Sequence, residues 1–291
     1  MEIVTSPREM QSKAEESRRK KLSLGLVPTM GYFHEGHLSL MRRARADCDV
    51  VVVSLFVNPT QFGPGEDLGR YPRDVERDEK LATAEGVDVM FVPEAADMYA
   101  EGYATYVDVE RLTEVLCGAR RPGHFRGVAT VVAKLLNICR PTVAYFGRKD
   151  YQQAQVIRRL AADLNYGVKI EVLPIVREAD GLAMSSRNSY LSPEERRRAT
   201  CLYRALARAQ ALFAEGERRP AKFLDEMAAV VKAEPAAEID YVEIVHPFEL
   251  TPVPKVEAGS VAALAAFINK TRLIDNTIIG KEDLKVGVSP C

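Results

Sequence analysis

Two histidines three residues apart, His34 and His37, are the side chains best placed to do chemistry, and they are half of the four histidines in this 291-residue chain. They follow an apolar stretch, 22–27, that is typical of a buried strand, and they lead into an expected helix over 38–46. A strand, a Gly and Pro turn and a helix place the positive amino end of the helix at a concave site. Two imidazoles on the same side of the first turn suit an anionic ligand, most obviously a phosphate. An ordinary surface turn is the weaker alternative.

Two amides follow the most apolar stretch of the chain, 50–57. Asn58 and Gln61 come at the end of this expected strand, which is a ligand position in an α/β sheet. Their amides can recognise the hydroxyl and carboxylate groups of a small polar substrate. Capping of the turn is the alternative; it is favoured for Asn58 and equally good for Gln61.

The segment 147–153 repeats this arrangement after the expected strand 143–146. Lys149 could hold a phosphate as a point charge. Asp150 could cap the helix, orient Lys149 or approach a metal-bound phosphate, and Gln153 falls one turn further on, facing the crevice. Taken alone, a weak surface Lys–Asp pair would be the better interpretation.

A third segment, 177–188, lies at the apparent junction of two domains. It carries a flexible glycine, Gly181, followed by Ser185, Ser186 and Arg187. Two hydroxyls and an arginine after such a glycine form a phosphate clamp that could close over a nucleotide. A serine-rich interdomain loop is the ordinary alternative, and the histidine pair shifts the balance toward the clamp.

Two other polar groups are less informative. His124 and Arg126 precede a long apolar helix and could face the same crevice, although a buried structural histidine is equally consistent with the pattern. Asp74, Glu76 and Asp78 could touch a magnesium ion, but acids at a helix start complement the helix dipole in any case, and we favour that role.

Short β-branched stretches alternate with amphipathic helices over the first two-thirds of the chain. This pattern predicts an α/β fold with a Rossmann-like, doubly wound parallel sheet whose ligand crevice lies at the strand carboxyl ends. The expected strands are 22–27, 50–57, 87–92, 143–146 and 168–172, and the expected helices are 38–46, 74–85, 128–139 and 151–164.

The pattern changes after Arg177. One long charged helix is expected over 193–215, a second from Pro220, and antiparallel strands over 239–245 and 261–267. These elements predict a smaller carboxyl-terminal α+β domain. We therefore expect domains at 1–176 and 177–283, with a loose tail over 284–291.

Composition and missing motifs exclude several classes of protein. A hydrophobic content of 47% with 28% charged residues is ordinary for a soluble globular protein, and a net charge of −1 gives no general attraction to nucleic acid or membranes. No signal peptide or membrane span is recognisable, so we expect a cytoplasmic protein. The P-loop, dinucleotide-binding and H-E-x-x-H motifs are absent. The five cysteines lack metal-ligand spacing and indicate a reducing compartment: Cys48, Cys117, Cys139, Cys201 and Cys291.

These motifs recur together, in order, in one family. They are the stretches 28–31, 34–37, 56–59, 61–62, 71–73, 124–127, 149–153, 180–188 and 271–276. In them the chain resembles the pantothenate synthetase (pantoate–β-alanine ligase) family, within the nucleotidyltransferase superfamily related to class I aminoacyl-tRNA synthetases. The H-x-G-H pattern alone indicates only the superfamily. Asn58, Gln61, Gln153 and the sequence Arg272-Leu273-Ile274-Asp275-Asn276 make the resemblance specific.

The resemblance implies ATP-dependent condensation of (R)-pantoate with β-alanine to pantothenate, AMP and pyrophosphate. The reaction would pass through an enzyme-bound pantoyl adenylate, require Mg²⁺ and take place in a homodimer. Residues 1–176 would bind nucleotide and pantoate, and 177–283 would form a lid. The metal ligands stay unknown.

The resemblance also assigns roles to individual residues, with His37 as the proton donor. Donors and positive charge for the phosphates would come from His34, His37, Lys149, Ser185, Ser186 and Arg187. ATP would be bound by Met30, Gly31, His34, Gly36, His37, Gly147, Arg148, Lys149, Asp150, Val176, Met184, Ser185, Ser186 and Arg187. Pantoate and β-alanine would be bound by Gln61, Gln153 and Asn58.

Two residues differ from the family pattern, and three other functions are alternatives to this interpretation. Arg148 stands where many relatives have an acidic or amide residue, and Phe33 where an aliphatic one is common, but neither removes a functional group. A different nucleotidyltransferase would keep the nucleotide in its product. A truncated tRNA-synthetase-like protein is disfavoured by the balanced charge. A catalytically dead nucleotide sensor is disfavoured because His37 and Lys149 are both present.

Overall fold

The chain forms two compact units over residues 1–281 and 284, which are the residues that the computed structural model describes. The amino-terminal unit comprises Met1–Thr113, Arg121–Arg148 and Gln153–Leu173. The carboxyl-terminal unit comprises Glu114–Arg120, Lys149–Gln152 and the described residues from Pro174 onward. The tail expected over 284–291 lies outside the described residues except for Leu284.

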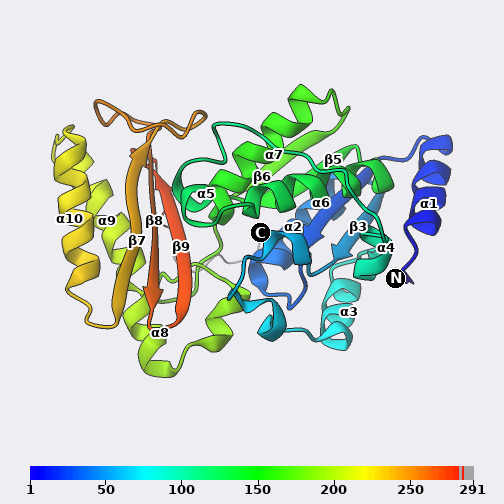
Figure 1. The fold of residues 1–291 in the computed structure, drawn as a ribbon, viewed down its shortest axis with the longest axis horizontal. Helices are drawn as coiled ribbons and strands as arrows, with labels where there is room; N and C mark the ends of the chain where they lie inside the picture. Colours follow the sequence, from blue (N-terminus) through cyan, green and yellow to red (C-terminus); the bar gives the residue numbers. More distant parts are fainter. Residues whose placement is uncertain (282–283, 285–291) are drawn as a thin grey trace. The chain divides into compact units, whose positions relative to one another are not determined.

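A six-stranded parallel sheet forms the centre of the amino-terminal unit. In their order across the sheet, the strands are β1 Glu2–Val4, β4 Val89–Phe91, β3 Val50–Leu55, β2 Leu24–Thr29, β5 Val143–Gly147 and β6 Lys169–Leu173 (Figure 1). The predicted α/β fold with a parallel sheet is therefore confirmed. The chain progresses outward in one direction from β2 and in the other from β5, so the direction switches between these two neighbours. In such sheets ligands bind at the strand carboxyl ends beside this switch point.

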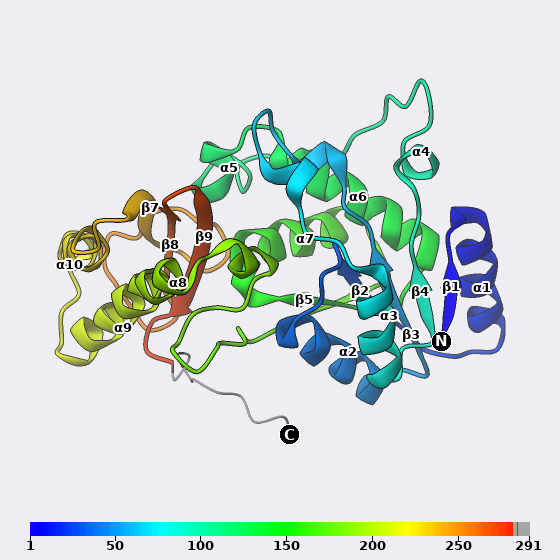
Figure 2. The same cartoon turned by 90° about the horizontal axis from the view of Figure 1, so that it is seen from below.

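Helices cover both faces of this sheet. Helix α2 packs on β2, β3 and β5, and α6 and α7 lie on the opposite face (Figure 2). The core under α2 is aliphatic and aromatic, and it includes Phe33, Met41, Val53 and Tyr145, all fully buried. The helices around the parallel sheet are α1 Pro7–Arg19, α2 Glu35–Asp47, α3 Val75–Ala84, α4 Ala95–Met98, α6 His124–Cys139 and α7 Tyr151–Asp163. Two-sided burial explains why the central strands are continuous apolar runs in the sequence.

The carboxyl-terminal unit contains an antiparallel sheet of three strands in the order β7, β8, β9. Its helices α9 and α10 pack on this sheet around a core that includes Leu206, Phe223 and Leu264. The elements are α5 Leu116–Arg120, α8 Pro193–Ala199, α9 Cys201–Ala214, α10 Pro220–Lys232, β7 Ala237–Val245, β8 Val261–Ile268 and β9 Thr271–Ile278. The antiparallel pairing expected for 239–245 and 261–267 is confirmed.

The single helix expected over 193–215 is wrong, because the structure has two helices that meet at Thr200. The backbone N–H of Thr200 and its hydroxyl both bond the carbonyl of Arg197, three residues back, which tightens and ends the first helix. Cys48, Cys117, Cys139 and Cys201 are buried free thiols, as expected for packing residues. None of the described helices combines the length and apolarity that crossing a bilayer requires.

Candidate active site

The two histidines lie together at the amino end of α2, directly after β2. His34 is the N-cap, and its Nδ1 accepts a hydrogen bond from the backbone N–H of Gly36 at 3.2 Å. His37 Nδ1 accepts from the backbone N–H of His34 at 3.3 Å, and the two ring centroids are 4.1 Å apart. Because each Nδ1 is an acceptor, each neutral ring carries its proton on Nε2. The pair therefore presents Nε2–H donors at the positive end of a helix, beside the switch point of the sheet.

The loop before these histidines is held by a residue from another helix, Asp78 of α3. Its two carboxylate oxygens accept hydrogen bonds from the backbone N–H groups of Tyr32 at 2.6 Å and Phe33 at 2.7 Å. The Asp78 side chain is only 1% exposed, and this burial raises its pKa although the two N–H groups oppose the rise. Both carboxylate oxygens serve the loop, and Asp74 caps α3 through the N–H of Arg77. The helix-cap role favoured for the acids is thus confirmed for Asp74.

Asn58 and Gln61 lie side by side in the loop after β3. Asn58 is 1% exposed, and its Oδ1 accepts from the Thr60 N–H, which confirms the capping role expected for it. Its Nδ2 donates to Gln61 Oε1 at 3.0 Å and so fixes the orientation of that amide. Gln61 Nε2 then lies 3.3 Å from Met30 Sδ. The expected acid-binding amide and the expected nucleotide loop therefore meet within the amino-terminal unit.

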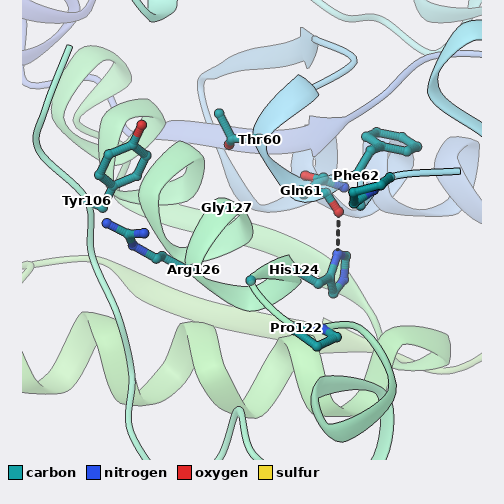
Figure 3. A pocket seen from close by; sticks show the side chains of 11 residues that line it. Thr60, Gln61, Phe62, Tyr106, Pro122, His124, Arg126 and Gly127 are labelled. Carbon is teal, nitrogen blue, oxygen red and sulfur yellow. Dashed lines mark hydrogen bonds between the residues drawn. The ribbon is translucent and has the colours of Figure 1, made fainter. Parts of the chain in front are cut away.

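A hollow of about 220 Å³ lies on the main-chain side of this loop (Figure 3). His124 and Gln61 both line it, and His124 points at Gln61 with Nδ1 at 2.8 Å from the Gln61 carbonyl oxygen. Arg126 turns instead to Tyr106, and its guanidinium carbon lies 4.1 Å from the ring centroid. Of the two residues, His124 contacts the expected acid-binding loop and Arg126 stacks on an aromatic ring.

The segment after β5 supplies a cation and an amide. A 3₁₀ turn, Arg148–Asp150, leads directly into α7. Among the described residues, the Lys149 ammonium has no ion-pair or hydrogen-bond partner, so the alternative of a Lys149–Asp150 surface pair is not found. Gln152 is buried and donates to the Val115 carbonyl at 2.7 Å. The half-buried amide of Gln153 makes no hydrogen bond within the described part of the chain and is available to a ligand.

The third segment is a small hairpin of the carboxyl-terminal unit. The Met184 N–H donates to the Val176 carbonyl at 3.0 Å, and Arg177 pairs with Ala183 in an antiparallel bridge. Gly181 turns this hairpin at a φ of +91°, where a Cβ would lie 2.6 Å from the Tyr203 ring. The glycine expected to be flexible therefore occupies a packed turn that excludes any side chain.

The hydroxyls and arginine expected to clamp a phosphate follow this hairpin in a short 3₁₀ helix, Ser186–Tyr190. Ser185 caps the helix and accepts from the Arg187 N–H at 3.3 Å. The two expected nucleotide segments of this region, Val176 and 184–187, are thus joined in one local structure.

Two residues of β9, which the sequence analysis assigned no role, support these segments. Asp275 forms a fully buried ion pair with Arg177, with Nη–Oδ distances of 2.6 and 2.9 Å. Its neighbour Asn276 donates from Nδ2 to the Lys149 carbonyl at 3.0 Å. Their only sequence signal is membership of the specific stretch 272–276.

Each unit carries part of the expected site. The amino-terminal unit contains Met30, Gly31, His34, Gly36, His37, Asn58, Gln61, Gly147, Arg148 and Gln153. The carboxyl-terminal unit contains Lys149, Asp150, Val176, Met184, Ser185, Ser186 and Arg187. Within the described residues, no three His, Cys, Asp or Glu side chains gather as a metal-binding group.

Comparison with known proteins gives a consistent result over nearly the whole chain. The family model described as "Pantoate-beta-alanine ligase" matches residues 2–278. A pantothenate synthetase of Heliobacterium modesticaldum is 58% identical over 279 residues, which cover 96% of this chain and 99% of that protein. One from Thermotoga neapolitana is 55% identical over 280 residues, 96% of this chain and 100% of that protein.

Solved structures agree. The crystal structure of pantothenate synthetase from Thermus thermophilus superposes with a TM-score of 0.91 at 48% identity, covering 96% of this chain and 99% of that one. A pantoate–β-alanine ligase from Francisella tularensis, crystallised in complex with "Beta-gamma ATP and Beta-alanine", gives a TM-score of 0.80 at 34% identity, covering 96% and 97% of the two chains.

Proposed function

This chain belongs to the pantoate–β-alanine ligase family and is an ATP-dependent ligase that joins pantoate to β-alanine, and we propose that it does so through a pantoyl-adenylate intermediate. In the first step an oxygen of the pantoate carboxylate attacks the α-phosphorus of ATP, and the bond to the bridging oxygen breaks to release pyrophosphate. In the second step the β-alanine amine attacks the activated carbonyl, and AMP leaves. The complex formed by the Francisella relative supports ATP and β-alanine as ligands of this chain.

The phosphate-binding groups are donors and cations. Negative charge grows on the pyrophosphate as it leaves, so donors placed in advance lower the barrier. The Nε2–H groups of His34 and His37 supply two such donors, with His37 as the proton donor. Lys149, whose ammonium has no partner among the described residues, supplies positive charge. Ser185, Ser186 and Arg187 complete the catalytic set.

The remaining nucleotide contacts come from the loops around these groups. They are Met30, Gly31, Gly36, Gly147, Arg148, Asp150, Val176 and Met184. Main-chain N–H groups in such loops are suited to an anionic phosphate chain.

The acid-binding groups are amides. Gln61 and Gln153 bind pantoate, and Gln61 also contacts β-alanine. Asn58 belongs to the same group and acts by fixing the Gln61 amide through its Nδ2. Amides recognise hydroxyl and carboxylate groups together because they both donate and accept.

We propose that Mg²⁺ binds together with the nucleotide. In phosphoryl transfer Mg²⁺ is usually held by substrate phosphates together with one or two carboxylates and water. Asp150, beside Lys149, is the carboxylate that could join such an ion. When bound, Mg²⁺ would neutralise charge on the leaving pyrophosphate.

The two domains have different proposed roles. Residues 1–176 bind nucleotide and pantoate, and 177–283 form a lid that protects the acyl phosphate anhydride from water. No strong base is needed if β-alanine binds as its free amine, because the acyl group is already activated. The enzyme acts as a homodimer in the cytoplasm, and its buried free thiols are consistent with a reducing compartment. Light scattering tests the dimer.

The observation that carries this proposal is that the paired histidines and the Gln61 amide belong to one unit, in which Gln61 Nε2 lies 3.3 Å from the Sδ of Met30, four residues before His34. The test measures AMP and pyrophosphate release with ATP and Mg²⁺, adding pantoate and β-alanine separately and together. AMP release only with both substrates, and pyrophosphate–ATP exchange with pantoate alone, are expected. No response to pantoate would reject the proposal in favour of another nucleotidyltransferase.

A further inference from the structure

The Gln61 main chain is held by three charged or polar side chains, Glu66, Arg121 and His124, that the proposed reaction does not use; Figure 3 shows the bond from His124. Arg121 forms a two-pronged ion pair with Glu66, with Nε–Oε1 at 2.7 Å and Nη2–Oε2 at 2.6 Å. The Nη1 of Arg121 lies 3.0 Å from His124 Nε2, and Nη2 reaches the Gln61 carbonyl at 3.4 Å. His124 Nδ1 lies 2.8 Å from the same carbonyl.

The partners of His124 fix its protonation. A guanidinium only donates, so His124 Nε2 must accept from Arg121. A carbonyl only accepts, so Nδ1 must carry the proton that bonds Gln61. His124 is therefore a neutral ring protonated at Nδ1, the opposite arrangement to His34 and His37. Burial opposes charge on Glu66, but its bonds to Arg121 outweigh burial and hold the Glu66 pKa below its usual value, which keeps the ion pair charged.

The same helix also fixes how closely the loop approaches. Gly127 lies one turn after His124 in α6, and a Cβ there would lie 2.4 Å from the Thr60 carbonyl oxygen and 2.7 Å from Gln61 Cα. Only glycine allows this approach. Asn58 Nδ2, which orients the Gln61 amide, also donates to the Gly127 carbonyl at 3.2 Å. Contacts with the first turn of α6 thus position both the main chain and the side chain of Gln61.

We propose that Arg121 and His124 are positioning residues for acid recognition, which hold the Gln61 carbonyl so that its amide lies where pantoate must bind. This inference rests on the proposed role of Gln61. It explains why a histidine and a glycine occur three residues apart in 124–127: one bonds the Gln61 carbonyl, and the other lets the helix reach it.

The test compares three variants of the full-length enzyme at His124. His124→Asn keeps a side-chain N–H close to the position of Nδ1, and His124→Gln keeps an acceptor near Nε2 but loses the donor to Gln61. We expect His124→Ala and His124→Gln to lower kcat/KM for pantoate by about 10- to 100-fold, the effect of a displacement on the order of 1 Å, with the KM for ATP little changed. His124→Asn should recover most of the loss. Arg121→Ala should resemble His124→Ala.

Arg126→Ala is the matched control, because Arg126 lies on the same helical turn and lines the same hollow but stacks on Tyr106. It should leave the KM for pantoate unchanged. Melting temperatures of all variants separate misfolding from misplacement, and a folded His124→Ala enzyme with normal pantoate kinetics would overturn the inference. An equal loss of kcat/KM for pantoate in His124→Asn and His124→Gln would also overturn it. Gln61→Ala distinguishes failure of this inference from failure of the proposed function. If Gln61→Ala leaves the KM for pantoate unchanged, Gln61 itself does not bind pantoate.

Discussion

Asn276 donates its side-chain amide to the main-chain carbonyl of Lys149, at 3.0 Å, across 127 positions of the sequence. The next residue back, Asp275, forms the buried ion pair with Arg177 at the base of the 176–184 hairpin. A single strand, β9, therefore supports both of the segments that the carboxyl-terminal unit is proposed to contribute to the phosphates.

Asn276→Ala should weaken ATP use, because the Lys149 main chain loses its anchor while the Lys149 ammonium itself stays. We expect kcat/KM for ATP to fall by roughly 10-fold or more, with a smaller change for pantoate. Steady-state kinetics against each substrate check this. Asn269→Ala is the control, because Asn269 is exposed and bonds Glu195. Equal behaviour of the two variants would refute the anchoring role.

Asp275→Ala should act on stability. Removing one partner of a fully buried ion pair leaves the Arg177 charge without a counter-ion, which typically reduces the free energy of unfolding by about 3–5 kcal/mol. Urea unfolding followed by circular dichroism measures this. A loss below about 1 kcal/mol, the range of an exposed ion pair, would contradict the burial of the pair in solution.

His37→Ala should lower turnover by roughly 10²–10³-fold, the usual effect of losing one donor to developing charge, and leave the fold intact. His246→Ala is a suitable control in the other unit, because the His246 Nδ1 accepts the Phe248 and Glu249 N–H groups at a turn. Single-turnover formation of the adenylate isolates the step. Activity of His37→Ala close to wild type would reject the role of this residue.

The neighbouring glutamines should give opposite results. Gln153→Ala should raise the KM for pantoate far more than that for ATP, because its amide has no protein partner within the described residues. Gln152→Ala should mainly reduce stability, by about 1 kcal/mol, through loss of its bond to the Val115 carbonyl. Kinetics with each substrate and a melting curve separate the two. Equal losses for both substrates in Gln153→Ala would move this residue out of the acid pocket.

The pH dependence of stability should reveal Asp78. Burial raises its folded pKa above the ordinary value of about 3.9, so folding favours the protonated form. The contribution of Asp78 is therefore greatest below about pH 4 and is lost as the pH rises through the folded pKa. Urea unfolding from pH 4 to 7 should show wild type losing stability relative to Asp78→Asn. The opposite trend would mean that the Tyr32 and Phe33 N–H groups outweigh burial.

The parts that the sequence predicts well are those fixed by local pattern. The all-valine start of β3 is typical of a strand buried on both faces, and the strand–turn–helix at His34 places both imidazoles at a helix start. The first strand, β1, has only three residues, two of them exposed, and its apolar stretch of Ile3 and Val4 is too short to indicate a strand.

The parts that the sequence does not predict are long-range contacts between polar groups. The bonds from the Tyr32 and Phe33 N–H groups to Asp78 span about 45 positions, and that between Asn276 and Lys149 spans 127. Nothing in the neighbourhood of an aspartate or an asparagine tells which distant backbone it will bind. The requirement for glycine at position 127 is equally hard to predict, because it arises only from the close approach of the Thr60 main chain.

The location of β9, Thr271–Ile278, far behind the parallel sheet in the sequence has a consequence for biosynthesis. Domains fold as they emerge from the ribosome, amino-terminal parts first. The six strands of the parallel sheet are all translated by Leu173, long before Asp275 and Asn276 exist. A nascent chain can thus complete its histidine loop early, but the supports for Lys149 and Arg177 arrive only with β9. Premature termination upstream of Thr271 would yield a polypeptide with an intact parallel sheet and an unsupported nucleotide segment.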